Sequence, residues 1–91
     1  MSLVFPNKSR SFEPAQRRVR FWGHDSAIEI TFFVEADALL RMVPDTSLDE
    51  QGLLSAFDRM SAQIHDMAVK SYNRDRGRSH VYVIAARDLQ N

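Results

Sequence analysis

The chain has 91 residues, of which 44% are hydrophobic and 26% are charged, a composition typical of one small folded domain rather than of a disordered or fibrous chain. It contains no cysteine, which excludes disulfides, thiolate zinc sites, iron–sulfur clusters and thiol catalysis. Its net charge is zero, so overall charge gives no reason to expect nucleic acid or an anionic membrane as a partner. The opening residues do not resemble a signal peptide and no apolar stretch is long enough to span a membrane. We therefore expect a cytoplasmic protein with no membrane partner.

The charges are distributed unevenly along the chain. Residues 1–20 contain five basic side chains and one acid, residues 21–69 contain nine acids and two arginines, and residues 70–91 contain five basic side chains and two acids. Arginine dominates the basic clusters at 17–20 and 74–78, and its planar guanidinium suits carboxylates, phosphates and aromatic rings. We expect these clusters to pair mainly with acids of the same chain on a solvated surface.

The first half of the chain has the pattern of a hairpin that follows an irregular segment. Residues 1–16 are predicted to be an irregular lead-in, in which Leu3–Phe5 could form a short edge strand before a proline. A period of two then predicts an antiparallel hairpin over 18–34, with its turn at Gly23–Ser26. The alternation within Ile28–Val34 assigns the even-numbered side chains to the buried face.

Helical spacing begins directly after the hairpin. A short helix is predicted from Ala36 until Pro44, since apolar residues recur there at intervals of three and four. Ser47 followed by Glu50 has the pattern of a capping box, which predicts the start of one long helix that continues to Asn73. The apolar stripe of this helix consists of Leu53, Phe57, Met60, Ile64, Met67 and Ser71.

The last predicted strand covers residues 79–84. The order of elements predicts an α+β fold with a small antiparallel or mixed sheet of three to four strands, made of the hairpin 18–34 plus strand 79–84. The short helix and the long helix are expected to pack on one face of this sheet. We expect a single domain over residues 1–91, with the lead-in at 1–16 and the α+β body at 17–89.

The sheet face opposite the helices carries unusually large rings for a solvated surface. Its predicted residues are Trp22, Phe33, Tyr82 and Ile84, lying among Arg18, Arg20, Glu29 and Thr31. Either the lead-in folds back to cover these rings with Phe5 and Phe12, or a partner covers them. A symmetric dimer through this face would hide the rings and stabilise a domain whose own core is small.

No set of residues predicts catalysis or metal binding. The His–Asp neighbours at 24–25 and 65–66 are poor acid–base pairs, because adjacent side chains point in different directions. The three histidines lack the spacing of metal ligands, and the chain has no nucleophile elbow, phosphate loop or dinucleotide fingerprint. We assign no catalytic, cofactor-binding or metal-binding residue, and we expect that the protein is not an enzyme.

Several sequence segments resemble a small bacterial family of uncharacterised proteins. They are F-P-N-K-S-R-S-F at 5–12, V-R-F-W-G-H-D at 19–25, I-E-I-T-F-F-V-E-A-D-A-L at 28–39, and the helix pattern of Phe57, Ile64, Ala68 and Tyr72. The chain is similar over nearly its whole length to the family called domain of unknown function 1488. The resemblance implies a compact bacterial α+β protein without an established activity, so it implies no site residue.

The leading hypothesis is a non-enzymatic domain that acts by protein contact or self-association, as a homodimer or with an unknown protein partner. The candidate interaction face consists of Trp22, Phe33, Tyr82, Arg18, Arg20, Arg76 and Arg78. The alternative is a nucleic-acid-associated accessory protein that uses the Arg clusters at 17–20 and 74–78. If the strand at 79–84 lies beside the first strand of the hairpin, the two clusters can share a sheet end or flank Trp22 and Tyr82, which would favour this alternative. Zero net charge weighs against it.

Overall fold

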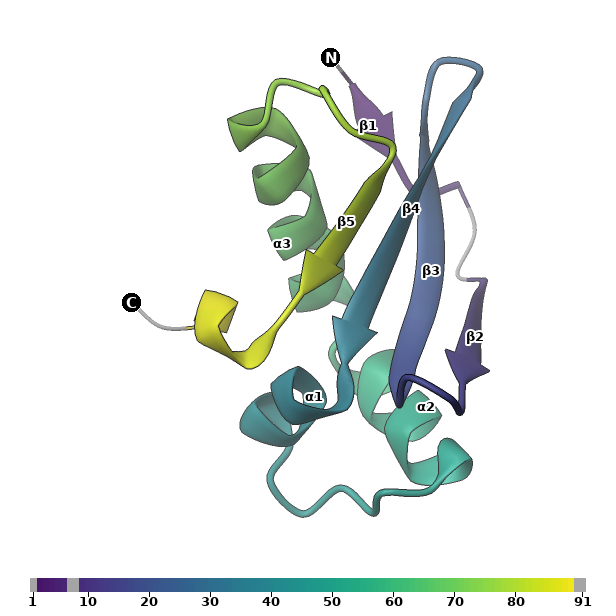
Figure 1. Ribbon diagram of the computed structural model, residues 1–91, viewed down its shortest axis with the longest axis vertical. Coiled ribbons are helices and arrows are strands. Elements are labelled where there is room, and N and C mark those ends of the chain that lie inside the picture. The colour runs from purple at the N-terminus through teal and green to yellow at the C-terminus, as the bar shows by residue number, and fades with distance from the viewer. Residues whose placement is uncertain (1, 7–8, 90–91) are drawn as a thin grey trace.

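A computed structural model describes residues 2–6 and 9–89 of the chain. Its elements are β1 (Leu3–Val4), β2 (Arg10–Glu13), β3 (Arg18–Asp25), β4 (Ile28–Glu35), α1 (Ala36–Met42), α2 (Glu50–Arg59), α3 (Ser61–Arg74), β5 (Val81–Ile84) and the 3₁₀ helix η1 (Ala86–Leu89). The strands form one mixed sheet in the order β1-β3-β4-β5, and β2 pairs with the same edge of β3 as β1 (Figure 1). The predicted α+β fold is confirmed.

The centre of the sheet is the β3–β4 hairpin, as predicted. Its eight antiparallel pairs run from Arg18 opposite Glu35 to Asp25 opposite Ile28. The strands are longer than expected, because the turn occupies only residues 26–27. Strand β5 lies beside β4 and runs parallel to it, since the three helices between these strands return the chain to the same end of the sheet.

Gly23 explains why the turn lies later than predicted. It is a buried strand residue, and a Cβ atom at this position would lie 2.7 Å from the carbonyl oxygen of Val4 and 2.8 Å from the ring of Phe5. This glycine therefore permits the close approach of β1 rather than a change of chain direction.

The short edge strand expected at Leu3–Phe5 is confirmed by β1, whereas the prediction that the rest of residues 1–16 is irregular is wrong at Arg10–Glu13. This N-terminal segment thus contributes both β1 and β2 to the sheet edge, while residues 1, 7 and 8 lie outside the described part. The ring of Phe5 packs on the helix side, 5.9 Å from that of Phe21 and 5.8 Å from that of Phe32, and Phe12 also packs against the core. The expected cover of the opposite face by Phe5 and Phe12 is therefore wrong.

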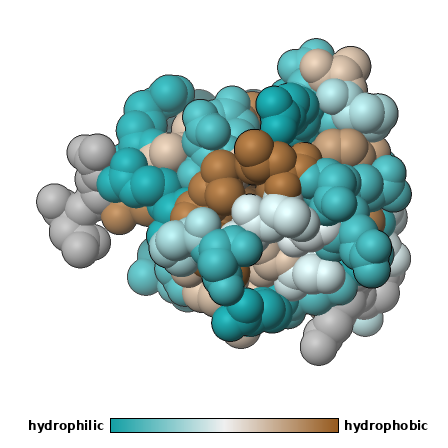
Figure 2. Space-filling view, turned by 90° about the horizontal axis from the view of Figure 1, so that it is seen from below, coloured by the Kyte–Doolittle hydropathy of each residue, from teal (hydrophilic) through white to brown (hydrophobic). Residues whose placement is uncertain are grey.

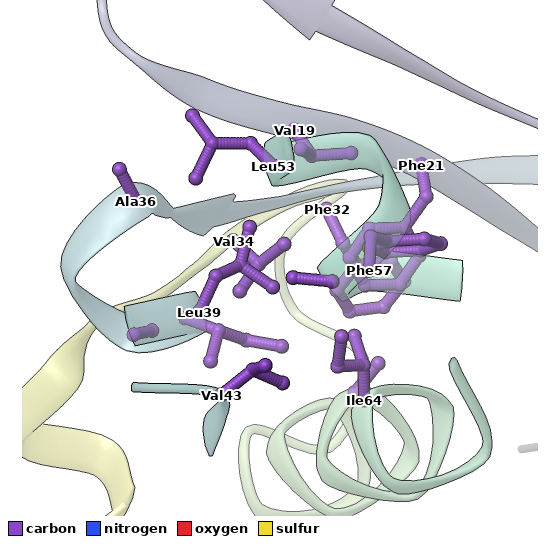
Figure 3. Packing of buried hydrophobic residues seen from close by; sticks show 14 of the residues in the cluster. Val19, Phe21, Phe32, Val34, Ala36, Leu39, Val43, Leu53, Phe57 and Ile64 are labelled. Carbon is purple, nitrogen blue, oxygen red and sulfur yellow. The ribbon is translucent and has the colours of Figure 1, made fainter. Parts of the chain in front are cut away.

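The core fills the space between the sheet and the helices. The inward side chains in the middle of β3 and β4, which include Phe21 and Phe32, are 0–1% exposed. Ile28 was expected on the buried face as well, but it is 49% exposed because it lies beside the hairpin turn, so that prediction is wrong. The buried side chains meet Leu39 of α1, Phe57 of α2 and Ile64 of α3 (Figure 3). Burial of this apolar layer is the main contribution to stability that the chain offers, because it has no disulfide.

The predicted long helix is two helices that meet at Met60. This residue has φ −107° and ψ 15°, outside the helical region, although the apolar stripe continues on both sides of it. The break lets α2 pack against β2 and β3 while α3 packs against β5. The helix also begins later than the capping-box prediction, since Asp49 is the N-cap and accepts a hydrogen bond from the Gly52 backbone N–H at 2.8 Å.

Among the described residues, no helix has both the length and the apolar character that crossing a membrane requires.

Candidate functional site

The side of the sheet away from the helices, which we call the open face, is defined by the alternation of side chains along each strand. Its members are Val4, Ser11, Glu13, Arg18, Arg20, Trp22, His24, Glu29, Thr31, Phe33, Glu35, Val81 and Val83. The register arranges these residues in rows across the strands, so their neighbours are fixed by backbone pairing.

Two rows form the centre of the open face, which we call the apolar centre because most of its side chains are rings and valines. In one row Trp22 lies beside Thr31, which lies beside Val81. In the next row Phe33 lies between Arg20 and Val83. Val81 and Val83 are 53% and 46% exposed, so the centre presents aliphatic and aromatic surface to the outside.

Charged rows border this apolar centre at both ends. His24 lies opposite Glu29 at the hairpin-turn end, and Arg18 lies opposite Glu35 at the other end. On the open face, β3 carries the basic side chains and β4 carries acidic ones. The buried Nδ1 atom of His24 has no hydrogen-bond partner among the described residues.

Arginine side chains contact the rings of the open face directly. The guanidinium of Arg18 lies 3.6 Å from the ring centre of Phe33, and that of Arg20 lies 4.7 Å from that of Trp22. Arg18 also donates to Glu13 at 2.8 Å. These cation–π contacts hold the rings in place without removing the valine surface beside them.

The structure brings together four of the seven predicted interaction residues: Trp22, Phe33, Arg18 and Arg20. The placement of Tyr82 and Ile84 on the same face is wrong, because Tyr82 packs on the helix side, 5.5 Å from the ring of Phe32, and Ile84 is 1% exposed in the core. Its hydroxyl donates to Asp75 at 2.7 Å and accepts from the Ser79 backbone N–H at 3.3 Å. Burial, with the bond to Asp75, raises the pKa of Tyr82.

Arg76 and Arg78 lie far from the other predicted arginines. They precede β5, which begins opposite Thr31, whereas Arg18 pairs with Glu35 at the other end of β4. Because β5 lies beside β4 and not beside β3, the two Arg clusters do not flank one set of rings. The arrangement that would favour the nucleic-acid alternative is therefore wrong.

Sequence reasoning missed Val81 and Val83 as members of the open face. Both alternating sets of β5 are apolar, so periodicity did not determine which set faces the helices. The sequence signal that could have placed Tyr82 on the helix side is its hydroxyl. A tyrosine that packs in a core needs a polar partner, and Asp75 lies seven residues before it in the chain.

A second aromatic–carboxylate pair lies at the tip of the hairpin on the helix side. The hydroxyl of Tyr72 in α3 donates to Asp25 at 2.6 Å, which raises the pKa of Tyr72 to about 12. The same bond, followed by the Ser2 backbone N–H, lowers the pKa of Asp25. This hydrogen bond ties the end of α3 to β3. Asp25, which follows His24 in the sequence, thus has a structural contact with Tyr72.

The described residues also include a polar hollow of about 500 Å³ between α3 and η1. Its side chains include Lys70, which pairs with Asp66 at 3.0 Å, and two arginines, Arg74 and Arg87. No group of three or more histidine and carboxylate side chains gathers to hold a metal ion anywhere in the described part of the chain.

A separate exposed apolar area lies at the end of the molecule formed by α1 and α2. Figure 2 shows apolar surface there, surrounded by hydrophilic residues. Leu48 is 50% exposed and lines a hollow of about 360 Å³ with Ala36 and Leu40. This area is an apolar surface separate from the open face, and a partner could contact either of them.

Comparison with known proteins adds a family but no activity. No curated protein and no solved structure gives a significant match to the chain. Residues 3–84 match the model of a family described as a protein of unknown function, DUF1488, and because the match covers most of the chain, the protein belongs to this family.

Proposed function

We propose that this protein is a non-enzymatic domain that acts by protein contact through the open face. The observation that carries the proposal is the apolar centre around Trp22, Phe33 and Val83, bordered by charged rows. Protein interfaces combine an apolar centre with a polar rim, and tryptophan and arginine are enriched among the residues that contribute most to binding. The proposal includes a bacterial origin, as the family resemblance implies, and a cytoplasmic location, which fits the cysteine-free composition.

The folding of the N-terminal segment supports this proposal. Phe5 and Phe12, the aromatic residues of the N-terminal segment, pack on the helix side and leave the open face uncovered by this segment. Among the described residues, the cover of Trp22 and Phe33 comes from the arginines of the same face. The exposed valines of β5 remain as surface that a protein partner would bury.

The charges of the open face favour a protein partner over nucleic acid. Three glutamates, at positions 13, 29 and 35, lie on the same face as Arg18 and Arg20. Nucleic-acid affinity grows with the number of phosphates neutralised, and these carboxylates would repel a phosphate backbone. A titration with labelled single-stranded DNA and RNA at low salt is expected to show no binding near ten micromolar, by the general scale of non-specific affinities.

Site-specific photocrosslinking tests which apolar surface meets a partner. A photoreactive aromatic amino acid replaces Val83 in one variant and Leu48 in another, and both are irradiated in the source cells. The two positions are comparably exposed, at 46% and 50%, and belong to the two separate apolar areas. We expect a discrete covalent adduct from position 83 and none from position 48, in variants whose thermal unfolding matches the wild type.

The adduct is then identified by mass and its binding reconstituted with purified components. Arg18→Glu, which changes the open face without touching position 83, is expected to reduce the adduct. Adducts from position 48 alone, from both positions alike, or from neither would overturn the proposal.

A further inference from the structure

We infer that the open face binds a second copy of this chain, related by a two-fold axis that lies midway between the two packed sheets and runs parallel to β3 and β4 above the line between them. The inference rests on the proposed function, because it names the partner of the same face. It follows from the register of the sheet and from the sign of the charge on each strand.

The axis determines which residues face each other. A half-turn about a line parallel to the strands keeps every residue at its position along the strand and exchanges β3 with β4. Each open-face residue of β3 therefore faces a residue of the partner's β4. That residue is the partner's copy of the one with which it is paired across the hairpin in its own chain. Because the axis lies in the middle of the order β1-β3-β4-β5, the whole width of the face is covered.

This arrangement places opposite charges together at one end of the strands and two polar side chains together at the other. Arg18 faces the partner's Glu35, and His24 faces the partner's Glu29. Two sheets packed face to face are about 10 Å apart and keep their strands within about 30° of each other. An arginine and a glutamate side chain can together bridge such a gap. Because β3 and β4 lie close to the axis, the angle between the two sheets moves the ends of these strands only a little out of alignment with the partner's strands.

The two rows of the apolar centre meet in the middle of the same arrangement. Trp22 faces the partner's Thr31, and Phe33 faces the partner's Arg20. Each copy already stacks Arg20 on Trp22, so two such stacks lie together and exclude water from the middle of the interface.

The other in-plane axis, perpendicular to the strands, is disfavoured by the same charges. It would place each strand antiparallel to its own copy and bring Glu35 against the partner's Glu29. Like charges facing each other in an interface cost free energy and discriminate against the wrong arrangement.

Pairing through the β5 edge of the sheet is also disfavoured. The hydroxyl of Ser79 accepts from the Val81 backbone N–H at 3.1 Å and donates to the Val81 carbonyl at 2.8 Å. The Ala85 backbone N–H donates to the Asp88 carboxylate at 2.7 Å. These side chains occupy backbone groups on both sides of Val83, and β5 is only four residues long, so this edge offers little backbone for pairing with a second copy.

Charge reversal in two separate chains tests the axis. Arg18→Glu and Glu35→Arg each place like charges across the interface in a homodimer. In an equal mixture, each chain instead meets the opposite charge at both contacts. Arg18 and Glu35 are also neighbours within one chain, and that local repulsion persists in the mixture. Recovery on mixing therefore reports contact between chains and not repair of the fold.

Sedimentation equilibrium provides the readout. For the wild type we expect a mass of two chains, each of 10.5 kDa, at high micromolar concentration. Each variant alone is expected to raise the dimer dissociation constant by about tenfold or more, and the mixture is expected to return it close to the wild-type value. The single tryptophan, Trp22, lies in the interface, so its emission is expected to shift to shorter wavelength on dimerisation.

The outcomes separate this inference from the proposed function. A wild-type chain that stays at 10.5 kDa while position 83 crosslinks a different protein overturns the inference and supports the proposed function. A dimer whose variants do not recover on mixing overturns the axis. If either reversal variant fails to fold, Arg18→Gln and Glu35→Gln remove the attraction without adding repulsion. Both are then expected to weaken the dimer and reduce its salt dependence, and an unchanged salt dependence would overturn the charge pairing.

Discussion

The two faces of the β3–β4 hairpin are built from alternating residues of the same strands, and they are held in different ways. Phe32 is fully buried between the sheet and the helices, and its ring contacts other rings at 5.3–5.8 Å. Its neighbour Phe33 is partly exposed and lies under the guanidinium of Arg18. Two identical side chains, adjacent in the chain, thus differ in surroundings because strand side chains point to alternate sides.

This difference shows how a small sheet can be stable on one side and receptive on the other. The helix-covered face gains stability from apolar burial and close packing. The open face arranges its rings and charges by contacts that are weaker and partly solvated. A partner can therefore replace water on the open face without any rearrangement of the core.

The largest expected effect comes from comparing the two phenylalanines. Phe32→Ala should lower the free energy of unfolding by about 3–5 kcal/mol, because it removes a buried ring and leaves a cavity. Phe33→Ala should lower it by roughly 1 kcal/mol, since it removes a partly exposed ring and one cation–π contact. Urea unfolding followed by circular dichroism measures both. Equal losses would show that the two faces do not differ in burial as described.

A second prediction concerns how the N-terminal strand joins the buried face. Gly23→Ala should destabilise the protein by about 1–3 kcal/mol, because the added methyl group would overlap the Val4 carbonyl and the Phe5 ring. The loss should be smaller when Phe5→Ala is already present, since part of the overlap is then gone. Denaturant unfolding of the four members of this cycle gives the coupling. Additive losses would mean that Phe5 does not pack on Gly23.

Local patterns predicted those parts of the fold that depend on neighbours in the chain. The alternation around Ile30 and the helical spacing around Phe57 identify buried faces, because one residue of slippage would expose them. The break at Met60 has no such local signal, since the stripe continues through it and methionine is a good helix former. The break follows from the positions of β2 and β5, which are long-range features.

The candidate site was predicted only where it lies on the hairpin. Trp22 and Phe33 follow from alternation within one continuous segment. The contribution of β5 depends on which strand it joins and which side it turns outward, and both alternating sets of its residues are apolar. The N-terminal segment was misjudged for a similar reason, because Phe5 reaches the core through a space that only Gly23 provides.

A smaller effect measures the contact that organises the open face. A double-mutant cycle of Arg18→Ala and Phe33→Ala should give a coupling of about 0.5–1 kcal/mol, as for a partly exposed cation–π pair. The cycle is measured at low protein concentration, where self-association does not contribute. Arg76→Ala, which removes an arginine away from this ring, provides the control and should show no coupling with Phe33→Ala. A coupling near zero for the first pair would mean that the arginine does not stabilise the ring.

The smallest expected effect tests the bond between Tyr72 and Asp25, which ties α3 to the hairpin tip. The Tyr72 hydroxyl lowers the pKa of Asp25 in the folded protein, so this carboxylate adds stability above its unfolded pKa, and the gain disappears as the pH falls through the folded value. The pKa of Tyr72 is raised to about 12, so the same bond adds stability below the ordinary tyrosine pKa of about 10 and loses it as the pH rises toward 12. The Tyr72→Phe variant should therefore be less stable than the wild type at neutral pH, and the difference in stability should shrink at both low and high pH.

An NMR titration of Asp25 provides the direct readout. Tyr72→Phe should raise the pKa of Asp25, whereas Tyr82→Phe, which removes a hydroxyl bonded to Asp75, should leave the titration of Asp25 unchanged. An unchanged Asp25 titration in Tyr72→Phe would show that the helix layer does not hold the hairpin tip through this bond.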